Sequence, residues 1–269
     1  MYTTNPKISI ITITYNSEKT LENTIKSVIS QGYDNLEYLI IDGGSKDHTL
    51  DIVERYKDKI AVVVSEPDKG ISDAFNKGIR LASGEIIGII NSDDQLLPNA
   101  LAVIARNYAP DVDVYRGELI VNNTKSGYKF RGKPSMDISV KRYMKLGVSH
   151  PSTFITKRAY GLYGGYDIAI RYIMDIDMLC RLYNNGCKFK YVPFALAMFN
   201  TGGATNDAFY KKITERYYVI RKNGGSLILA FYISTVMMLK DVCKLLLDNL
   251  FGENLKYKLK KRKNIATNA

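Results

Sequence analysis

The sequence predicts an α/β fold in which a mostly parallel sheet is flanked by helices, with a helical extension at the C-terminal end. Through residue 98, short β-branched runs alternate with amphipathic segments, and such alternation is typical of parallel strands joined by right-handed crossovers. The run 86–90 holds four isoleucines and no charge, as expected of a strand buried on both faces. Polar residues follow each run, at the edge where open α/β sheets bind their ligands.

The first 98 residues supply four strands and three helices. β-Branched and aliphatic residues mark the strands, and apolar residues at helical spacing mark the segments between them. The expected strands are 8–14, 36–41, 60–64 and 86–90, the third and fourth of them buried. The expected helices are 17–31, 47–56 and 72–82. Ser17 and Asp47 stand where N-cap residues are expected.

Residues 99–205 follow a less regular pattern. A turn near Asn122-Asn123 separates two strand-like segments, which predicts a hairpin. The expected strands of this half are 112–121, 126–131, 152–156 and 188–193. The expected helices are 135–145 and 173–182, and a flexible loop is expected at 202–205.

Four polar segments lie at the predicted carboxyl ends of the first four strands. They are Tyr15-Asn16, Asp42, Asp68-Lys69 and Asp93-Asp94. Because the ends of parallel strands meet along one edge, these segments are expected to form one polar cleft. Two adjacent carboxylates repel each other unless a cation lies beside them, and hard oxygen ligands suit Mg²⁺ or Mn²⁺. The alternative is that the acidic pair only caps a helix, but the convergence of four loops favours a ligand site.

Composition narrows the classes of partner. The 269 residues include 38 Lys and Arg against 27 Asp and Glu, a formal net charge of +11, so an anionic partner such as a nucleotide, a phospholipid or a nucleic acid is expected. The motifs Gly-x-Gly-x-x-Gly after the first strand and Gly-x-x-x-x-Gly-Lys anywhere are missing, which argues against a dinucleotide-dependent oxidoreductase and against P-loop chemistry. Three cysteines without a Cys-x-x-Cys spacing favour reduced thiols, and the first residues lack the apolar segment of a signal peptide.

The C-terminal segment 206–269 is predicted to be helical, amphipathic and basic. An apolar stripe recurs at helical spacing in Val236, Leu239, Cys243, Leu246 and Leu250. Residues 256–263 then hold six cations and no acid. An apolar stripe followed by a basic cluster favours contact with a membrane surface through 227–263, although the uncharged run is too short to span a bilayer. The alternative is a helix that packs on the domain or on a second subunit, with a solvated tail.

Four segments of this chain together resemble the family 2 glycosyltransferases of GT-A fold. The segments are 8–16, 41–45, 68–78 and 91–94, in the order and at the spacing that the family shows. Gly164-Gly165-Tyr166-Asp167 looks like the family's Gly-Gly-Phe-Asp segment, and Asp175-Ile176-Asp177 looks like the region of its catalytic acidic motif. The resemblance covers about residues 7–205 and is closest to bacterial members that build O-antigen and capsule polysaccharides.

The resemblance implies transfer of a sugar, with inversion, from a nucleotide sugar to an acceptor hydroxyl. It implies a donor that is usually a UDP-sugar, and Mn²⁺ or Mg²⁺ held by Asp94, with Asp93 at the ribose or the ion. The residues that it places at the nucleotide are Thr14, Tyr15, Asn16, Asp42, Asp68, Lys69 and Asp93. This chain departs from the pattern at Gly43, where many relatives carry Asp, so a nucleobase contact of the family is missing. The resemblance therefore implies metal and diphosphate binding more firmly than a preference for UDP.

The same resemblance assigns the remaining chemistry to the acidic motif. Asp175 is expected to be the base that takes the proton of the acceptor hydroxyl. Asp177 is the alternative base, and Met174 stands where many members have Glu. His150 and Asp177 are also candidate contacts for the acceptor or the diphosphate, although a lone histidine is more often structural.

These expectations divide the chain into three parts. Residues 1–98 form the nucleotide-sugar-binding half of the GT-A domain, 99–205 its acceptor-binding and catalytic half, and 206–269 the extension. The expected acceptor is a saccharide, in particular a lipid-linked one, reached from the cytoplasm at the inner face of the cell membrane. The alternatives are transfer to polyprenyl phosphate and a catalytically silent homologue that binds nucleotide or membrane. A homo-oligomer is compatible with the sequence, and nucleic acid is the weakest choice of partner because the basic residues gather in the tail.

Overall fold

The computed structural model describes residues 5–124, 126–134, 150–201 and 209–251. The helix expected at 135–145, the loop expected at 202–205 and the basic tail 256–263 lie outside the described residues.

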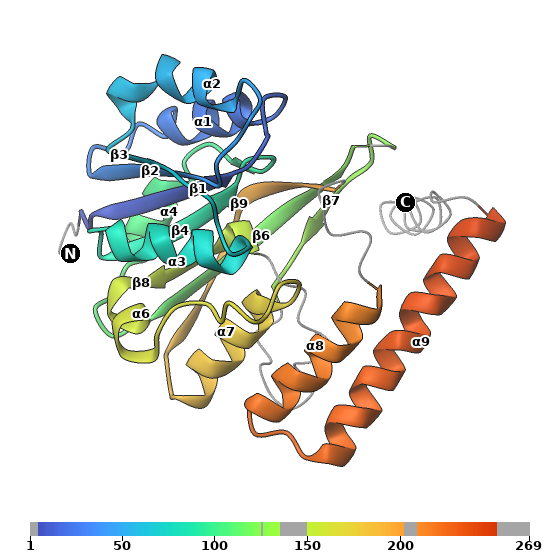
Figure 1. Cartoon of the computed structure of the whole chain (residues 1–269). Coiled ribbons are helices and arrows are strands. Elements are labelled where there is room, and N and C mark those ends of the chain that lie inside the picture. Colours follow the sequence, from blue (N-terminus) through green and yellow to red (C-terminus); the bar gives the residue numbers. More distant parts are fainter. Residues whose placement is uncertain (1–4, 125, 135–149, 202–208, 252–269) are drawn as a thin grey trace, which may run out of the picture.

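The described strands form a single mixed sheet (Figure 1). The strands are β1 (Ile8–Thr14), β2 (Leu36–Asp42), β3 (Val62–Ser65), β4 (Ile86–Asn91), β5 (Gln95–Leu96), β6 (Val114–Asn123), β7 (Lys129–Gly132), β8 (Thr153–Thr156) and β9 (Phe189–Thr201). Their order across the sheet is β3-β2-β1-β4-β8-β6-β9-β5, and β7 pairs with β6. The first four strands pair in parallel, whereas β8 runs antiparallel to both β4 and β6. The predicted α/β class and the expected hairpin at β6–β7 are confirmed.

Helices cover both faces of this sheet (Figure 1). They are α1 (Leu21–Ile29), α2 (Thr49–Arg55), α3 (Ile71–Leu81), α4 (Ala100–Asn107), α6 (Lys157–Tyr163), α7 (Met174–Asn184), α8 (Phe209–Lys222) and α9 (Leu227–Phe251). Side chains of α1, α2 and α4 pack on one face of the sheet in one hydrophobic cluster. Side chains of α3, α6 and α7 pack on the other face, and residues of α8 and α9 join that second cluster.

The parallel register brings the predicted polar segments to one edge of the sheet. Thr14 at the end of β1 lies opposite Asp42 at the end of β2, and Asp42 lies opposite Ser65 of β3. On the other side of β1, Ile13 lies opposite Asn91, the last residue of β4. The expectation that these loops share one rim is therefore confirmed for the four parallel strands.

Two local expectations are wrong. Ser17 does not cap the first helix: α1 begins only at Leu21, because the chain turns at Asn16, which has a φ of +48°, and the Ser17 hydroxyl contacts that of Ser92 at 2.8 Å. The third strand is not buried. β3 begins two residues later than expected and lies at the end of the sheet, so that Val63 is 43% exposed.

The last strand also differs from expectation, because β9 continues eight residues past Pro193 to Thr201. Proline cannot donate to a strand ladder and is tolerated at bulges. The pairing between β6 and β9 shifts register at this point, since Val192 lies opposite Gly117 and Ala195 lies opposite Glu118. The irregularity accommodates the proline, and the extended strand carries Asn200 to the rim.

The C-terminal helices α8 and α9 lie side by side as a hairpin next to α7 (Figure 1). Ala230 and Ile233 of α9 are buried together with Val219 and Ile220 of α8, so packing is continuous across the expected boundary at 206. None of the helices in the described part of the chain has the length and hydropathy needed to cross a bilayer.

The close packing of β4 predicts a cost for any side chain at Gly88. A Cβ there would lie 2.6 Å from Cε1 of Phe154 and 2.9 Å from Cδ1 of Ile10. We expect Gly88→Ala to lower the free energy of unfolding by about 1–3 kcal/mol through overpacking, measured by urea denaturation. Gly161→Ala in α6 is the matched control, because no atom lies within 4 Å of its Cβ position. Equal unfolding midpoints for the two variants would contradict the prediction.

Candidate functional site

Asp42 braces the loop that follows β2. Its fully buried carboxylate accepts hydrogen bonds from the amides of Gly44 (3.1 Å) and Ser45 (3.0 Å) and from the hydroxyls of Ser45 and Ser65. Both carboxylate oxygens are therefore used inside the protein. A direct contact between Asp42 and a nucleoside stays a prediction, whereas its role in shaping the loop is visible.

Tyr15, Gly43 and Asp68 meet beside this loop. The Tyr15 side chain is 62% exposed. A Cβ at Gly43 would lie 2.8 Å from Oδ2 of Asp68 and 3.4 Å from Cδ2 of Tyr15. Any side chain at position 43 would therefore collide with the Asp68 carboxylate in this arrangement. Asn16 completes the rim, because its Oδ1 accepts a hydrogen bond from the amide of Lys46 at 2.8 Å.

Asp68 is held by a buried lysine that sequence reasoning missed. Nζ of Lys77 lies 2.6 Å from Asp68, 3.0 Å from Glu66 and 3.7 Å from Asp73. Burial disfavours the ammonium, but the carboxylates of Asp68 and Glu66 outweigh this effect and raise the pKa of Lys77. The only signal in the sequence was the i,i+4 spacing of Asp73 and Lys77. Lys69, by contrast, is exposed at the rim, so its expected phosphate contact stays a prediction.

The acidic pair divides into one buried and one accessible residue. Asp94 is fully buried. Its Oδ1 accepts a hydrogen bond from the amide of Asn200 at 3.2 Å, and its Oδ2 accepts one from Nδ2 of Asn91 at 3.4 Å. Burial, and next the charge of Asp93, raises the pKa of Asp94 well above its usual range. Asp93 is only partly buried, and burial raises its pKa as well.

The surroundings of this pair fit a divalent cation. Thr14 Oγ1 and Asn91 Oδ1 are buried without a hydrogen-bond partner among the described residues, and they stand on the neighbouring strands β1 and β4. Burial disfavours the ionised forms of both carboxylates, and a hard cation would stabilise them and use the oxygen atoms that have no hydrogen bond. The described residues contain no group of three acidic, histidine or cysteine ligands, so a bound cation would take further oxygen ligands from a diphosphate or water. Asp93 is the more accessible of the two carboxylates, and which of them is the principal ligand stays a prediction.

Asp175 lies in a separate hollow at the start of α7. The hollow is lined by His150, Thr153, Ile155, Tyr166, Asp175, Met178 and Leu179. Burial raises the pKa of Asp175 to about 6, an effect that hydrogen bonds from its own helix turn and the positive charge of Arg116 oppose. Arg116 of β6 is itself fully buried and pairs in register with Thr153, on the side of the sheet that faces Asp175. The carboxyl group is thus poised to change its charge near neutral pH.

His150 belongs to the same hollow. Its ring stacks on Phe75 of α3, with ring centroids 4.8 Å apart and an angle of 13° between the planes. Burial lowers the pKa of His150 to about 4, so the imidazole is neutral at pH 7. Nε2 is buried without a hydrogen-bond partner among the described residues. This unused nitrogen agrees with the expected contact to an acceptor or diphosphate, which stays a prediction.

Helix α3 joins the nucleotide rim to this hollow. Asn76 donates from Nδ2 to the carbonyl of Tyr166 at 2.8 Å and accepts from the Tyr166 amide at 2.7 Å. Gly165 allows this approach, because a Cβ there would lie 2.2 Å from Oδ1 of Asn76. Ser72 adds a hydrogen bond to the carbonyl of Ile170 at 2.8 Å. Sequence reasoning assigned no role to Ser72 and Asn76, although both stand in the 68–78 motif.

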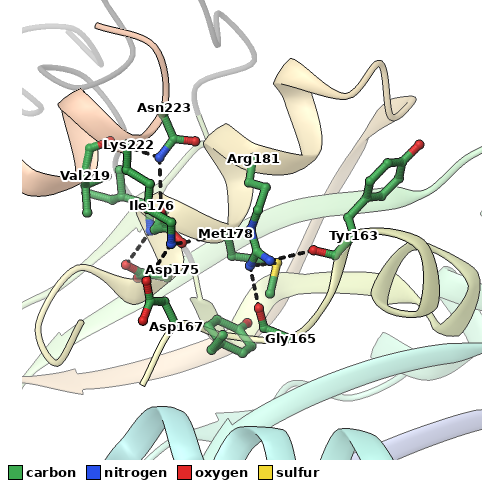
Figure 2. A network of polar contacts seen from close by, with 12 residues as sticks. Tyr163, Gly165, Asp167, Asp175, Ile176, Met178, Arg181, Val219, Lys222 and Asn223 are labelled. Carbon is green, nitrogen blue, oxygen red and sulfur yellow. Dashed lines mark hydrogen bonds and ion pairs between the residues drawn. The ribbon is translucent and has the colours of Figure 1, made fainter. Parts of the chain in front are cut away.

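Asp177 does not share the hollow with Asp175. Its fully buried carboxylate accepts hydrogen bonds from Lys222 Nζ (3.0 Å) and Asn223 Nδ2 (3.0 Å) at the end of α8. In α7, the helix that carries Asp177, Arg181 donates to the carbonyls of Tyr163 and Gly165 (Figure 2). Asp177 therefore belongs to a structural network, and a contact with acceptor or diphosphate does not agree with its place.

The chain is similar in sequence to known glycosyltransferases. The sequence model of glycosyl transferase family 2 matches residues 9–163. A PGL/p-HBAD biosynthesis glycosyltransferase of Mycobacterium tuberculosis is 27% identical over 253 residues, which cover 88% of this chain and 96% of the relative. The chondroitin synthase of Pasteurella multocida is 29% identical over 196 residues, 70% of this chain but 20% of that protein.

Solved structures share the fold. TarS of S. aureus (residues 1–349), in complex with UDP-GlcNAc, superposes with a TM-score of 0.64 at 20% identity and covers 85% of this chain and 70% of its own. The mannosyltransferase PcManGT of Pyrobaculum calidifontis, in complex with GDP-Man and Mn²⁺, gives a TM-score of 0.66 at 18% identity, with 97% and 80% covered. The mixed sheet, its helices and the polar rim thus have the GT-A architecture. Since the family model covers more than half of the sequence, the chain belongs to glycosyl transferase family 2.

Proposed function

We propose that this protein is an inverting, metal-dependent glycosyltransferase that moves a sugar from a nucleotide sugar to a saccharide acceptor carried on a lipid. The observation that supports this most is the link between two acidic sites. Asp93 lies at the rim of parallel strand ends, Asp175 lies in a hollow with a pKa near neutrality, and α3 contacts the hollow while it begins directly after the Asp68 loop. Donor binding and proton removal would then occur on one side of one scaffold.

At the donor site, Asp93 and Asp94 would hold Mn²⁺ or Mg²⁺ against the diphosphate, where the ion neutralises the charge of the leaving group. Tyr15, Asn16 and the loop braced by Asp42 would contact the nucleoside. TarS was solved with UDP-GlcNAc and PcManGT with GDP-Man and Mn²⁺. We favour a UDP-sugar for this chain, and GDP is the alternative that a binding assay must include.

At the acceptor site, Asp175 would remove the proton of the attacking hydroxyl. The hydroxyl oxygen bonds to the anomeric carbon while the bond to the diphosphate oxygen breaks, so a single displacement inverts the carbon. With a pKa of about 6, Asp175 is mostly ionised at pH 7 and still accepts a proton readily. His150 is neutral and would contact the acceptor without carrying charge.

The outer face of α9 supports a lipid-linked acceptor or polyprenyl phosphate. Ala230, Ile233 and Met237 turn toward the protein, whereas Ile228 is 83% exposed and Phe231 is 71% exposed. Among the α9 residues whose side chains the structure describes, Leu227, Tyr232, Leu239, Val242, Leu246 and Leu247 are exposed as well. An exposed apolar stripe followed by the basic segment 256–263 suits the interface of an anionic bilayer. The protein would thereby meet its acceptor at the inner face of the membrane, in the assembly of a cell-surface polysaccharide or glycolipid.

Substitution of Asp93 and of Asp94 should affect donor affinity to different extents. We expect Asp93→Asn to weaken binding of UDP in the presence of Mn²⁺ by roughly tenfold or more, because it removes the accessible ligand, as measured by calorimetry with and without EDTA. Asp94→Asn should have a smaller effect on affinity, because its carboxylate is buried and bonded to Asn200 and Asn91. A loss confined to Asp94→Asn would restore Asp94 as the principal ligand. Equal binding of UDP and GDP would remove the preference for UDP.

Asp175 makes a prediction about pH. The rate of turnover per bound donor should fall below an apparent pKa near 6, because the base must be ionised. Asp175→Asn should abolish turnover and leave donor affinity nearly intact. A carboxyl whose folded pKa is raised destabilises the fold as pH increases, here between pH 4 and 6, by about 3 kcal/mol at most. The variant should therefore melt at a higher temperature than the parent at pH 8 but not at pH 4. Unchanged turnover would defeat the assignment of the base.

The α9 face makes a prediction about membranes. We expect the protein to sediment with vesicles that contain anionic lipid and less with neutral ones, and Ile228→Asn with Phe231→Asn to abolish sedimentation. Leu162→Asn in α6, where the leucine is 66% exposed, is the control for loss of an exposed apolar side chain outside α9. If the parent protein stays in the supernatant and is a dimer by analytical ultracentrifugation, the face contacts a second copy instead.

A further inference from the structure

Helix α8 contacts the backbone directly before Asp175. Glu215 accepts a hydrogen bond from the amide of Arg171 at 2.9 Å through Oε1, and bonds from the amides of Tyr172 (2.8 Å) and Ile173 (3.3 Å) through Oε2. These residues lead into α7, which begins at Met174. The first amides of a helix have no partner within the helix, and a carboxylate is favourable at that end. Glu215 thus places a carboxylate just before the start of α7 and fixes the turn that leads into this helix.

A second set of contacts fixes the far side of the same turn. Lys222 Nζ lies 2.6 Å from Asp167 (Figure 2). It also lies 3.0 Å from Asp177, and Asn223 Nδ2 lies 3.0 Å from Asp177. A fully buried carboxylate such as Asp177 is costly unless it is paired. Glu215 and Lys222 are seven residues apart, two helical turns, and so lie on one face of α8. One helix face therefore holds the chain both before and after Asp175.

From these contacts we propose that α8 is part of the catalytic apparatus and that Glu215 is a positioning residue for Asp175. The inference rests on the proposed function, in which Asp175 is the base. Between residue 173, bonded to Glu215, and residue 177, bonded to Lys222 and Asn223, only three residues intervene. The direction in which the Asp175 carboxylate enters the hollow is set by these two anchors. The match to the family model ends at residue 163, so the anchors lie beyond the part of the sequence that defines the family.

The test compares Glu215→Ala and Glu215→Gln with Asp241→Ala. Asp241 of α9 pairs with Arg216 at 3.0 Å, so its loss weakens the hairpin without touching the turn. We expect Glu215→Ala to lower kcat by roughly 10- to 100-fold, as misplacement of a reacting group by about 1 Å does, with the KM for the donor changed less than about twofold. Glu215→Gln keeps an oxygen acceptor and should retain intermediate activity. Asp241→Ala should keep the kcat of the parent protein. All rates are taken well below the melting temperature of each variant.

The outcomes separate this inference from the proposed function. If Asp175→Asn is inactive while Glu215→Ala and Glu215→Gln both turn over like the parent protein, the positioning role is overturned and the base assignment stands. If Asp175→Asn is active, the base assignment itself fails. Losses of kcat that are equal in Glu215→Ala and Asp241→Ala would mean that only a loosened hairpin was measured, which also overturns the proposal. Should Glu215→Ala fail to fold, Glu215→Gln and Lys222→Met replace it in the test. The expected result is the same, a lower kcat with a nearly unchanged KM for the donor, and a parent-like kcat in both variants overturns the proposal.

Discussion

Placing carboxylates away from water is the constraint around which this protein is arranged. A buried carboxylate is tolerated only where hydrogen bonds or a positive charge compensate the lost hydration. Asp42 is compensated by two amides and two hydroxyls, and Asp177 by Lys222 and Asn223. Within the described residues, the Asp94 carboxylate accepts one amide hydrogen bond and one long side-chain hydrogen bond. The incomplete compensation at the rim agrees with a site that is completed by a ligand.

Helix α3 fixes the position of the Asp68 loop relative to the hollow that holds Asp175. Its first turn follows the Asp68 loop, its middle carries Phe75 against His150, and Asn76 holds the backbone of Tyr166 through two hydrogen bonds. A rigid helix transmits position better than a loop because its own hydrogen bonds fix every residue. The 68–78 segment therefore has a mechanical role in addition to the chemical role proposed for its first residues.

Local patterns predicted much of this architecture, and long-range contacts decided the rest. The β-branched runs and their polar ends predicted the parallel strands and the shared rim, because both depend on residues close in sequence. The hydrogen bond that Asp94 accepts comes from Asn200, more than 100 positions away, and the place of Asp177 depends on α8. The edge position of β3 depended on which strands pair. No spacing rule in a single sequence carries such information.

The hydrogen bonds between α8 and the start of α7 have a consequence for chimeric enzymes. Exchange of acceptor-binding modules between homologous transferases is an obvious route to new glycans. In this scaffold a junction placed after α7 would separate Asp175 from Glu215, which holds the turn before its helix, and Asp177 from Lys222, which pairs with it. A transplanted module would have to extend at least through Asn223 in order to include the residues that hold Asp175 and Asp177 in place.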